Sequence, residues 1–162
     1  MRKSNREITD FNEIVQVLKG CDVCRVALND TDGTPYIVPV NFAVGVDGDH
    51  VTLYFHSALE GHKLDLVARD ARAAFEMDRG HQLQYSRERG YCTFAYESVM
   101  GKGTVRMIED EKEKVRALDA IMAQYHPEGD APYNPAAIPR TVVWCLDVTE
   151  MTGKRKPLKP GM

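Results

Sequence analysis

The chain has 162 residues, of which 43% are hydrophobic and 28% charged, and its formal net charge is −3 at pH 7. That length and composition are ordinary for one globular domain with a full core. The mild negative charge argues against a general binder of nucleic acid or of a membrane surface, and no apolar run approaches the length that crosses a bilayer. The first residues lack a secretory signal and the four cysteines fit a reducing compartment, so we expect a soluble, cytoplasmic protein.

The predicted elements are mostly short strands joined by turns. Alternation of apolar and polar residues predicts strands over residues 23–29, 35–44, 51–56, 72–77, 91–108 and 141–148, the fifth of which is either two strands or one long bent strand. Amphipathic spacing predicts helices over residues 9–20, 60–69 and 109–125. Hairpins dominate and parallel βαβ alternation is absent, so we expect an antiparallel barrel with peripheral helices.

The remaining segments are predicted as loops and a tail. Residues 78–90 are polar and predict a loop, and the proline-rich residues 127–139 predict a loop long enough to cover a site or a partner. The basic residues near the C-terminus are typical of a solvated tail. We therefore expect a single domain over residues 1–153 and a basic tail over residues 154–162.

The most informative stretch runs from residue 51 to residue 66, where a strand passes through a polar turn into a helix. Four residues of types that hold a phosphate lie at this junction: His56, Ser57, His62 and Lys63. The first N–H groups of a helix are unpaired and its dipole is positive there, so a helix start binds anions. The stretch predicts a site for a phosphate-bearing cofactor, and an ordinary polar connection is the competing interpretation.

Cys21 and Cys24 form a lone C-x-x-C motif. A structural zinc site would need a second pair, and the motif follows a helix and opens a strand, which reverses the order of a thioredoxin-type site. We therefore expect Cys24 to be a small core residue. The five histidines show no metal-ligand spacing, so no metal site is predicted. His56 alone ends a strand beside the presumed anion site, where a histidine can bond a phosphate, ligate a haem iron or handle a proton.

Three pieces of the chain follow one another in a specific order: residues 35–42, 53–64 and 96–105. Read together, and with further matches at 140–146 and 152–154, they resemble the flavin-binding split-barrel superfamily of pyridoxamine 5′-phosphate oxidase. They resemble most its branch of nitroimidazole-resistance proteins. The resemblance implies a mainly β fold, a six-stranded antiparallel split β-barrel that pairs into a homodimer with FMN in each of two clefts at the interface.

The resemblance also implies which residues hold the FMN. Ser57, His62 and Lys63 would grip its phosphate, with His56 beside the ribityl chain or the ring. The remaining contacts would come from the backbone of Val38, Pro39, Val40 and Asn41 at the ring edge, from Ser98 and Val99 on a neighbouring strand, and from Trp144 of the other subunit. A flavin on that side of the strand offers a reason for Pro39, which cannot donate to a strand ladder.

The chain also departs from the oxidase. It lacks the oxidase's basic phosphate-binding strand and C-terminal Arg-x-His pair, so pyridoxamine phosphate oxidation is not expected. His62 stands where the oxidase has an arginine, which implies a weaker or pH-dependent grip on the phosphate.

The implied function is an FMN-dependent oxidoreductase of the nitroimidazole-reductase type. It would pass electrons from NAD(P)H to a small acceptor such as a nitroaromatic, with His56 as proton donor or substrate contact. A non-catalytic carrier or sensor of flavin or haem, with His56 as an axial ligand, is the alternative from another class. A deazaflavin cofactor is a third possibility on the same fold.

Overall fold

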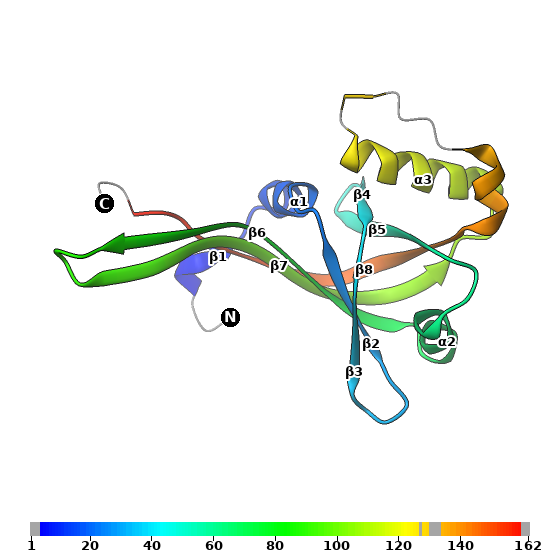
Figure 1. The fold of residues 1–162 in the computed structure, drawn as a ribbon, viewed down its shortest axis with the longest axis horizontal. Coiled ribbons are helices and arrows are strands. Elements are labelled where there is room, and N and C mark those ends of the chain that lie inside the picture. The colour runs from blue at the N-terminus through cyan, green and yellow to red at the C-terminus, as the bar shows by residue number, and fades with distance from the viewer. Residues whose placement is uncertain (1–3, 127, 130–133, 160–162) are drawn as a thin grey trace.

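The computed structural model describes residues 4–126, 128–129 and 134–159, and shows one antiparallel sheet with helices packed around it (Figure 1). Predictions for the other positions lie outside the described residues. Within the described part the elements are, in order, η1 (Ser4–Arg6), β1 (Glu7–Ile8), α1 (Phe11–Lys19), β2 (Cys24–Asn29), β3 (Pro35–Val40), β4 (Phe42–Asp47), β5 (His50–Ser57), α2 (His62–Arg69), β6 (Arg72–Ser86), β7 (Tyr91–Met107), α3 (Glu111–Tyr125), η2 (Pro135–Arg140) and β8 (Val142–Lys156).

The hydrogen-bonded strand order is β3-β2-β6-β7-β8-β5-β4, and β1 pairs with β8. The prediction of a mainly β chain with peripheral helices is confirmed. The sheet has eight strands in place of six, because the predicted 35–44 strand divides at Asn41 and the short β1 adds another. β3 pairs with β2 at one edge, whereas β4 pairs with β5 at the other. Among the described residues these two edge strands do not pair with each other, so the sheet is not closed.

Capping groups set the ends of the helices. The Asp10 carboxylate accepts the backbone N–H of Glu13 at 2.9 Å at the start of α1, and Asp110 does the same for Glu113 at 2.8 Å in α3. Both helices lie within the predicted ranges. α2 begins at His62, two residues later than predicted, and no side chain caps its first turn.

The core lies mainly between the sheet and α1, with a smaller cluster beneath α3. Trp144 is completely buried, and the centre of its ring lies 4.3 Å from that of Phe55. The cluster beneath α3 contains Ile108, Ala117, Val143 and Cys145. Successive side chains of a strand alternate between faces, so β8 is covered on both sides, by the main core and by α3.

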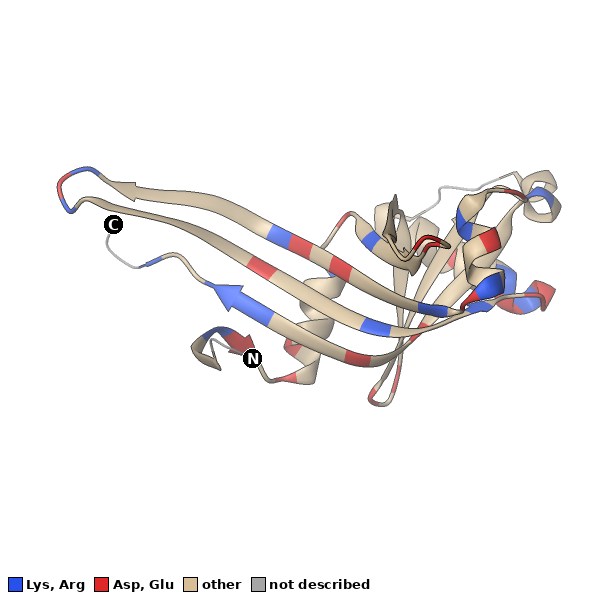
Figure 2. Ribbon diagram, turned by 90° about the horizontal axis from the view of Figure 1, so that it is seen from below, with Lys and Arg blue, Asp and Glu red and all other residues tan. Residues whose placement is uncertain are grey.

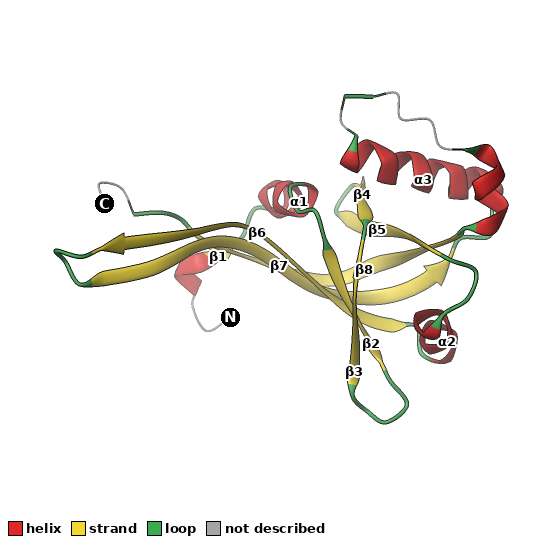
Figure 3. Cartoon of the chain, in the orientation of Figure 1, coloured by secondary structure: helices red, strands yellow, loops and turns green. Residues whose placement is uncertain are grey.

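The hairpin of β6 and β7 is the main departure from prediction. The loop prediction for residues 78–90 is wrong as far as Ser86, because β6 continues to that residue, and β7 is one strand of 17 residues (Figure 3). Leu83 and Tyr85 alternate with polar residues in a strand pattern that the overall polarity of the segment conceals. Residues 82–95, here called the arm, project from the rest of the sheet (Figure 1).

The C-terminal residues follow the arm. Lys154–Lys156 pair with β7, so their assignment to a solvated tail is wrong. Beyond β8, the Gln84 side chain donates to the Lys159 carbonyl at 2.7 Å and accepts the Lys159 N–H at 2.9 Å. This pair of bonds holds the described end of the chain against one face of the arm.

Candidate functional site

The last two residues of β5, His56 and Ser57, point their side chains to opposite faces of the strand. His56 is exposed and lines a pocket beneath α3, whereas the Oγ atom of Ser57 is buried. The Ser57 hydroxyl has no hydrogen-bond partner among the described residues. A buried polar group without a partner costs about 1–3 kcal/mol, so the Ser57 hydroxyl is a candidate contact for a ligand.

The start of α2 supplies further unpaired donors close by in the chain. Its first ladder bonds run from the N–H groups of Leu64 and Asp65 to the Gly61 carbonyl. The N–H groups of His62 and Lys63 precede that ladder, and no side chain caps the helix. Gly61 has φ 149°, a conformation that side-chain-bearing residues rarely adopt. The backbone of this turn can therefore approach an anion without a Cβ in the way.

The imidazole of His62 is already engaged. Its Nε2 lies 2.9 Å from the Asp30 carboxylate in the β2–β3 turn, and its ring meets the Tyr36 ring edge-on at 5.1 Å. Asp30 also accepts the backbone N–H of Thr31. The hydrogen bond from His62, and next that from the Thr31 N–H, hold the pKa of the Asp30 carboxyl below its ordinary value. The sequence did not reveal this pair, because it depends on how the hairpin docks on α2.

β3, which carries the predicted flavin-edge residues except Asn41, forms one edge of the sheet, and Asn41 follows directly after the strand. Val38 and Val40 are half-buried and pack against the core, whereas Pro39 and Asn41 are exposed. The contact between Tyr36 and His62 brings β3 to the start of α2. The structure thus places two predicted parts of the site, the β3 edge and the α2 start, beside each other.

The other predicted contacts lie elsewhere in the sheet. Ser98 and Val99 are on β7, and β2 and β6 separate that strand from β3. Ser98 is half-buried, Val99 is buried in the core, and Trp144 is buried with its Nε1 atom unpartnered. Their contact with a flavin held by another subunit stays a prediction.

The pocket beside His56 was not foreseen from the sequence. It has a volume of about 160 Å³ and is mostly apolar, and its other lining residues are Leu118, Ile121, Met122, Ala137, Ile138 and Thr141. They come from α3, from η2 and from the residue just before β8, so only the folded chain brings them to His56. A small flat molecule entering this pocket would meet mostly apolar walls, together with the His56 imidazole and the Thr141 side chain.

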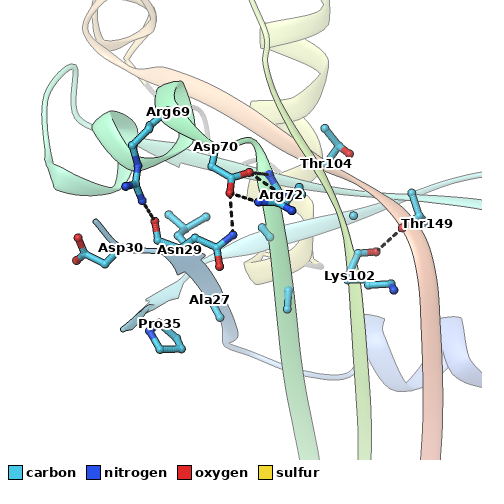
Figure 4. Close-up of a pocket in the computed structure, with 14 residues that line it drawn as sticks. Ala27, Asn29, Asp30, Pro35, Arg69, Asp70, Arg72, Lys102, Thr104 and Thr149 are labelled. Atoms are coloured by element: carbon cyan, nitrogen blue, oxygen red, sulfur yellow. Dashed lines mark hydrogen bonds and ion pairs between the residues drawn. The ribbon is translucent and has the colours of Figure 1, made fainter. Parts of the chain in front are cut away.

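A wider groove, of about 1110 Å³, lies at the C-terminal end of α2 and is lined by residues of β2, β6 and β7 (Figure 4). Arg69 at the end of the helix donates to the Asn29 carbonyl, and the Asn29 amide donates to Asp70 at 3.0 Å. The Arg72 guanidinium donates twice to Asp70 and holds the pKa of that carboxyl well below its ordinary value. Because Asn29 lies next to Asp30, adjacent residues of the hairpin contact both ends of α2.

Other features bear on the class of protein. Figure 2 shows acidic and basic residues interspersed along the long strands. Within the described residues, no cluster of three or more His, Cys, Asp or Glu side chains has the arrangement of a metal site, and no helix is long and apolar enough to cross a membrane. Cys24 is a buried core residue, as predicted, and Cys21 is a buried free thiol whose pKa is raised to about 11, mainly by burial.

The chain combines an open antiparallel sheet, an uncapped helix start and, shortly before that helix in the chain, an unpartnered hydroxyl, and these features fit a protein of the flavin-binding split-barrel class. The chain belongs to the pyridoxamine 5′-phosphate oxidase family, whose model matches residues 10–155. A search of curated protein sequences found no significant match.

Solved structures agree with this assignment. A candidate 5-nitroimidazole antibiotic resistance protein from Bacteroides thetaiotaomicron is 36% identical, with a TM-score of 0.80 over 92% of this chain and 86% of that chain. Two more distant structures share the fold. A flavocytochrome from Azotobacter vinelandii is 20% identical, with a TM-score of 0.76 over 99% of this chain and 73% of that one. An FAD- and haem-binding protein from Mycobacterium smegmatis is 22% identical, with a TM-score of 0.77 over 97% and 76%.

The residues present fit a flavin phosphate. A phosphate needs hydrogen-bond donors and positive charge, and Ser57, the free N–H groups of α2 and the Lys63 ammonium are donors of that kind. The unpartnered Ser57 hydroxyl is the specific observation, because a phosphate oxygen would supply its missing partner.

Proposed function

We propose that this chain is an FMN-binding oxidoreductase that passes electrons from NAD(P)H to a small acceptor such as a nitroaromatic. The observation that carries the proposal is the buried, unpartnered Ser57 hydroxyl, which precedes the uncapped start of α2 by a few residues, in a chain of this flavin-binding family. The 36% identity to a candidate nitroimidazole resistance protein supports the choice of acceptor. Pyridoxamine phosphate is not the proposed substrate, because the chain lacks the oxidase's basic strand.

The chain's own residues bind and orient the cofactor. Ser57, Lys63 and the backbone N–H of His62 hold the phosphate, and the imidazole of His62 stays with Asp30. The backbone at the β3 edge faces the ring through Val38, Pro39, Val40 and Asn41. When bound, FMN supplies the electron-transfer chemistry, and the protein supplies position and polarity.

His56 is the proposed contact for the acceptor. Its pocket beneath α3 offers apolar walls for a small aromatic ring. Among the described residues that line the pocket, the imidazole is the one titratable group, so it is the group placed to donate a proton there. This arrangement requires no second acid or base.

The other partner in the proposal is a second copy of the chain. One face of the arm exposes the side chains of Leu83, Tyr85 and Phe94. Those of Leu83 and Tyr85 are 61% and 62% exposed. A two-stranded hairpin is marginally stable alone in water, so this apolar face needs a cover. Ser98 is four residues from Phe94 on β7 and shares its face. A second copy that packs on the arm would therefore lie close to Ser98, and Ser98 is the residue expected to contact the flavin held by that second copy.

A haem carrier is the second candidate. The observation that favours it is the exposed imidazole of His56, because a histidine imidazole can serve as an axial ligand to haem iron. The two more distant structural neighbours are a flavocytochrome and an FAD- and haem-binding protein.

A visible spectrum of the purified protein, followed by titration with FMN and with haem, separates the two candidates. Oxidised flavin bands, FMN binding and NAD(P)H-dependent reduction of a nitroaromatic support the oxidoreductase. A haem spectrum without FMN binding supports the carrier. A colourless protein that binds neither contradicts both.

A further inference from the structure

The contact between Asp30, Tyr36 and His62 joins the two walls of the proposed cleft. Asp30 and Tyr36 belong to the β2–β3 hairpin, whose outer strand faces the flavin ring, and His62 is the first residue of α2, which holds the phosphate. The Asp30 side chain is 24% exposed and is fixed in its turn by the Thr31 N–H. The turn itself is closed by the Gly33 N–H, which donates to the Asp30 carbonyl. His62 therefore meets an acceptor whose side chain and turn are both hydrogen-bonded.

The same contact argues against His62 as the cation that grips the phosphate. Its Nε2 donates to a carboxylate at 2.9 Å, so only Nδ1 is left for any other partner. Because Asp30 contacts the His62 ring directly, its negative charge offsets any positive charge that the imidazole could offer to a phosphate. Lys63 and Ser57, by contrast, have no such carboxylate contact among the described side chains.

The opposite end of α2 is held by the neighbouring hairpin residue. Arg69 donates to the Asn29 carbonyl, and the Asn29 amide donates to Asp70. Figure 4 shows this end of the helix against the end of β2. Both ends of α2 thus contact the β2–β3 hairpin, and His62 makes the contact at the end that is proposed to hold the flavin.

We infer that Asp30 and His62 are positioning residues: their contact, backed by Tyr36, clasps the β2–β3 hairpin to the start of α2 and sets the width of the flavin cleft. This inference rests on the proposed function. It assigns the specific recognition of the phosphate to Ser57, Lys63 and the helix N–H groups. The imidazole of His62 then affects the whole flavin and not its phosphate alone.

The test compares the affinities of the apoprotein for FMN and for riboflavin, which lacks the phosphate. His62→Ala opens the clasp, so both affinities should fall together, about two- to fivefold, with their ratio unchanged. His62→Gln keeps an N–H donor for Asp30 without a positive charge, and should bind both flavins nearly as the wild type does. Asp30→Ala should match His62→Ala, and the double variant should be no worse than either one.

Two control variants show how far the affinities for FMN and riboflavin change when only the phosphate contact, or no part of the site, is altered. Lys63→Met should lower the FMN affinity and leave that for riboflavin unchanged. His50→Ala, at the far end of β5, should change neither. Circular dichroism and thermal unfolding of each apoprotein check that it is folded.

Three results overturn the clasp. They are a selective loss of FMN in His62→Ala and His62→Gln, an unchanged affinity for both flavins in His62→Ala, and additive effects in the double variant. A wild-type protein that binds neither flavin refutes the proposed function instead. In that case, thermal unfolding of Asp30→Ala, His62→Ala and the double variant tests the Asp30–His62 contact without a ligand. The contact is supported if the losses in midpoint of the two single variants are not additive.

Discussion

His56 and Ser57 are adjacent in β5, yet His56 lies beneath α3 beside an apolar pocket while the Ser57 hydroxyl is enclosed and unpartnered. One strand end thus presents two different chemical surfaces. On the proposed function, the phosphate is held on one side and the acceptor meets the other. Substitutions at the two positions should therefore affect separate properties.

Ser57→Ala should weaken FMN binding about tenfold, because the hydroxyl is proposed to donate to a charged phosphate. Riboflavin affinity should change little. The apoprotein should unfold at the same or a slightly higher temperature, since the variant removes a buried hydroxyl without a partner. Fluorescence titration and calorimetry measure both effects. Ser86→Ala, at the far end of the arm, is the matched control; equal losses of FMN in the two variants would contradict the assignment.

His56→Ala should keep bound FMN but lose most turnover with a nitroaromatic, about a hundredfold if the imidazole transfers a proton. Steady-state assays on protein with matched flavin content measure this. His50→Ala, another exposed histidine of β5, should retain full turnover. If His56→Ala turns over as fast as the wild type, the imidazole has no part in the reaction.

The arm should control the oligomeric state. Leu83→Glu combined with Phe94→Glu places two charges on its apolar face and should convert a dimer into a monomer. Size-exclusion chromatography with light scattering gives the mass. Gln82→Glu adds a charge on the opposite face and should leave the dimer intact. A wild-type protein that is monomeric at micromolar concentration would rule out this use of the arm.

Asp70 should contribute to stability in a pH-dependent way. The Arg72 guanidinium lowers the pKa of the Asp70 carboxyl below its ordinary value of 3.8. A lowered pKa in the folded state means that the stabilisation is fully present above pH 3.8 and is lost as the pH falls through the lower, folded value. Near pH 6 the wild type should therefore have a higher thermal midpoint than Asp70→Asn. The two midpoints should converge in strong acid. A constant difference at every pH would show that the carboxylate charge is not responsible.

Local features of the site were predictable from the sequence, and its long-range contacts were not. Ser57, His62 and Lys63 stand at a strand-to-helix junction that the residue pattern reveals directly. The partner of His62 is 32 residues away, and it depends on how a hairpin packs against a helix. The His56 pocket likewise requires α3 and η2 to fold over β5.

The fold shows the same division. The helices capped by Asp10 and Asp110 were predicted closely, because capping is a local signal. The break at Asn41 was missed because β3 and β4 read as one continuous strand, although they pair at opposite edges of the sheet. The arm was missed because its strand alternation lies among charged residues.

The two prolines of β3 also bear on how the protein stays dispersed. β3 is an open edge of the sheet, and an exposed edge offers its backbone to strands of other molecules. Pro35 and Pro39 lack the N–H that such pairing requires. Pro39→Val would restore a donor at this edge and should make the flavin-free protein aggregate on heating at concentrations where the wild type stays clear. Light scattering during a temperature ramp would record the difference.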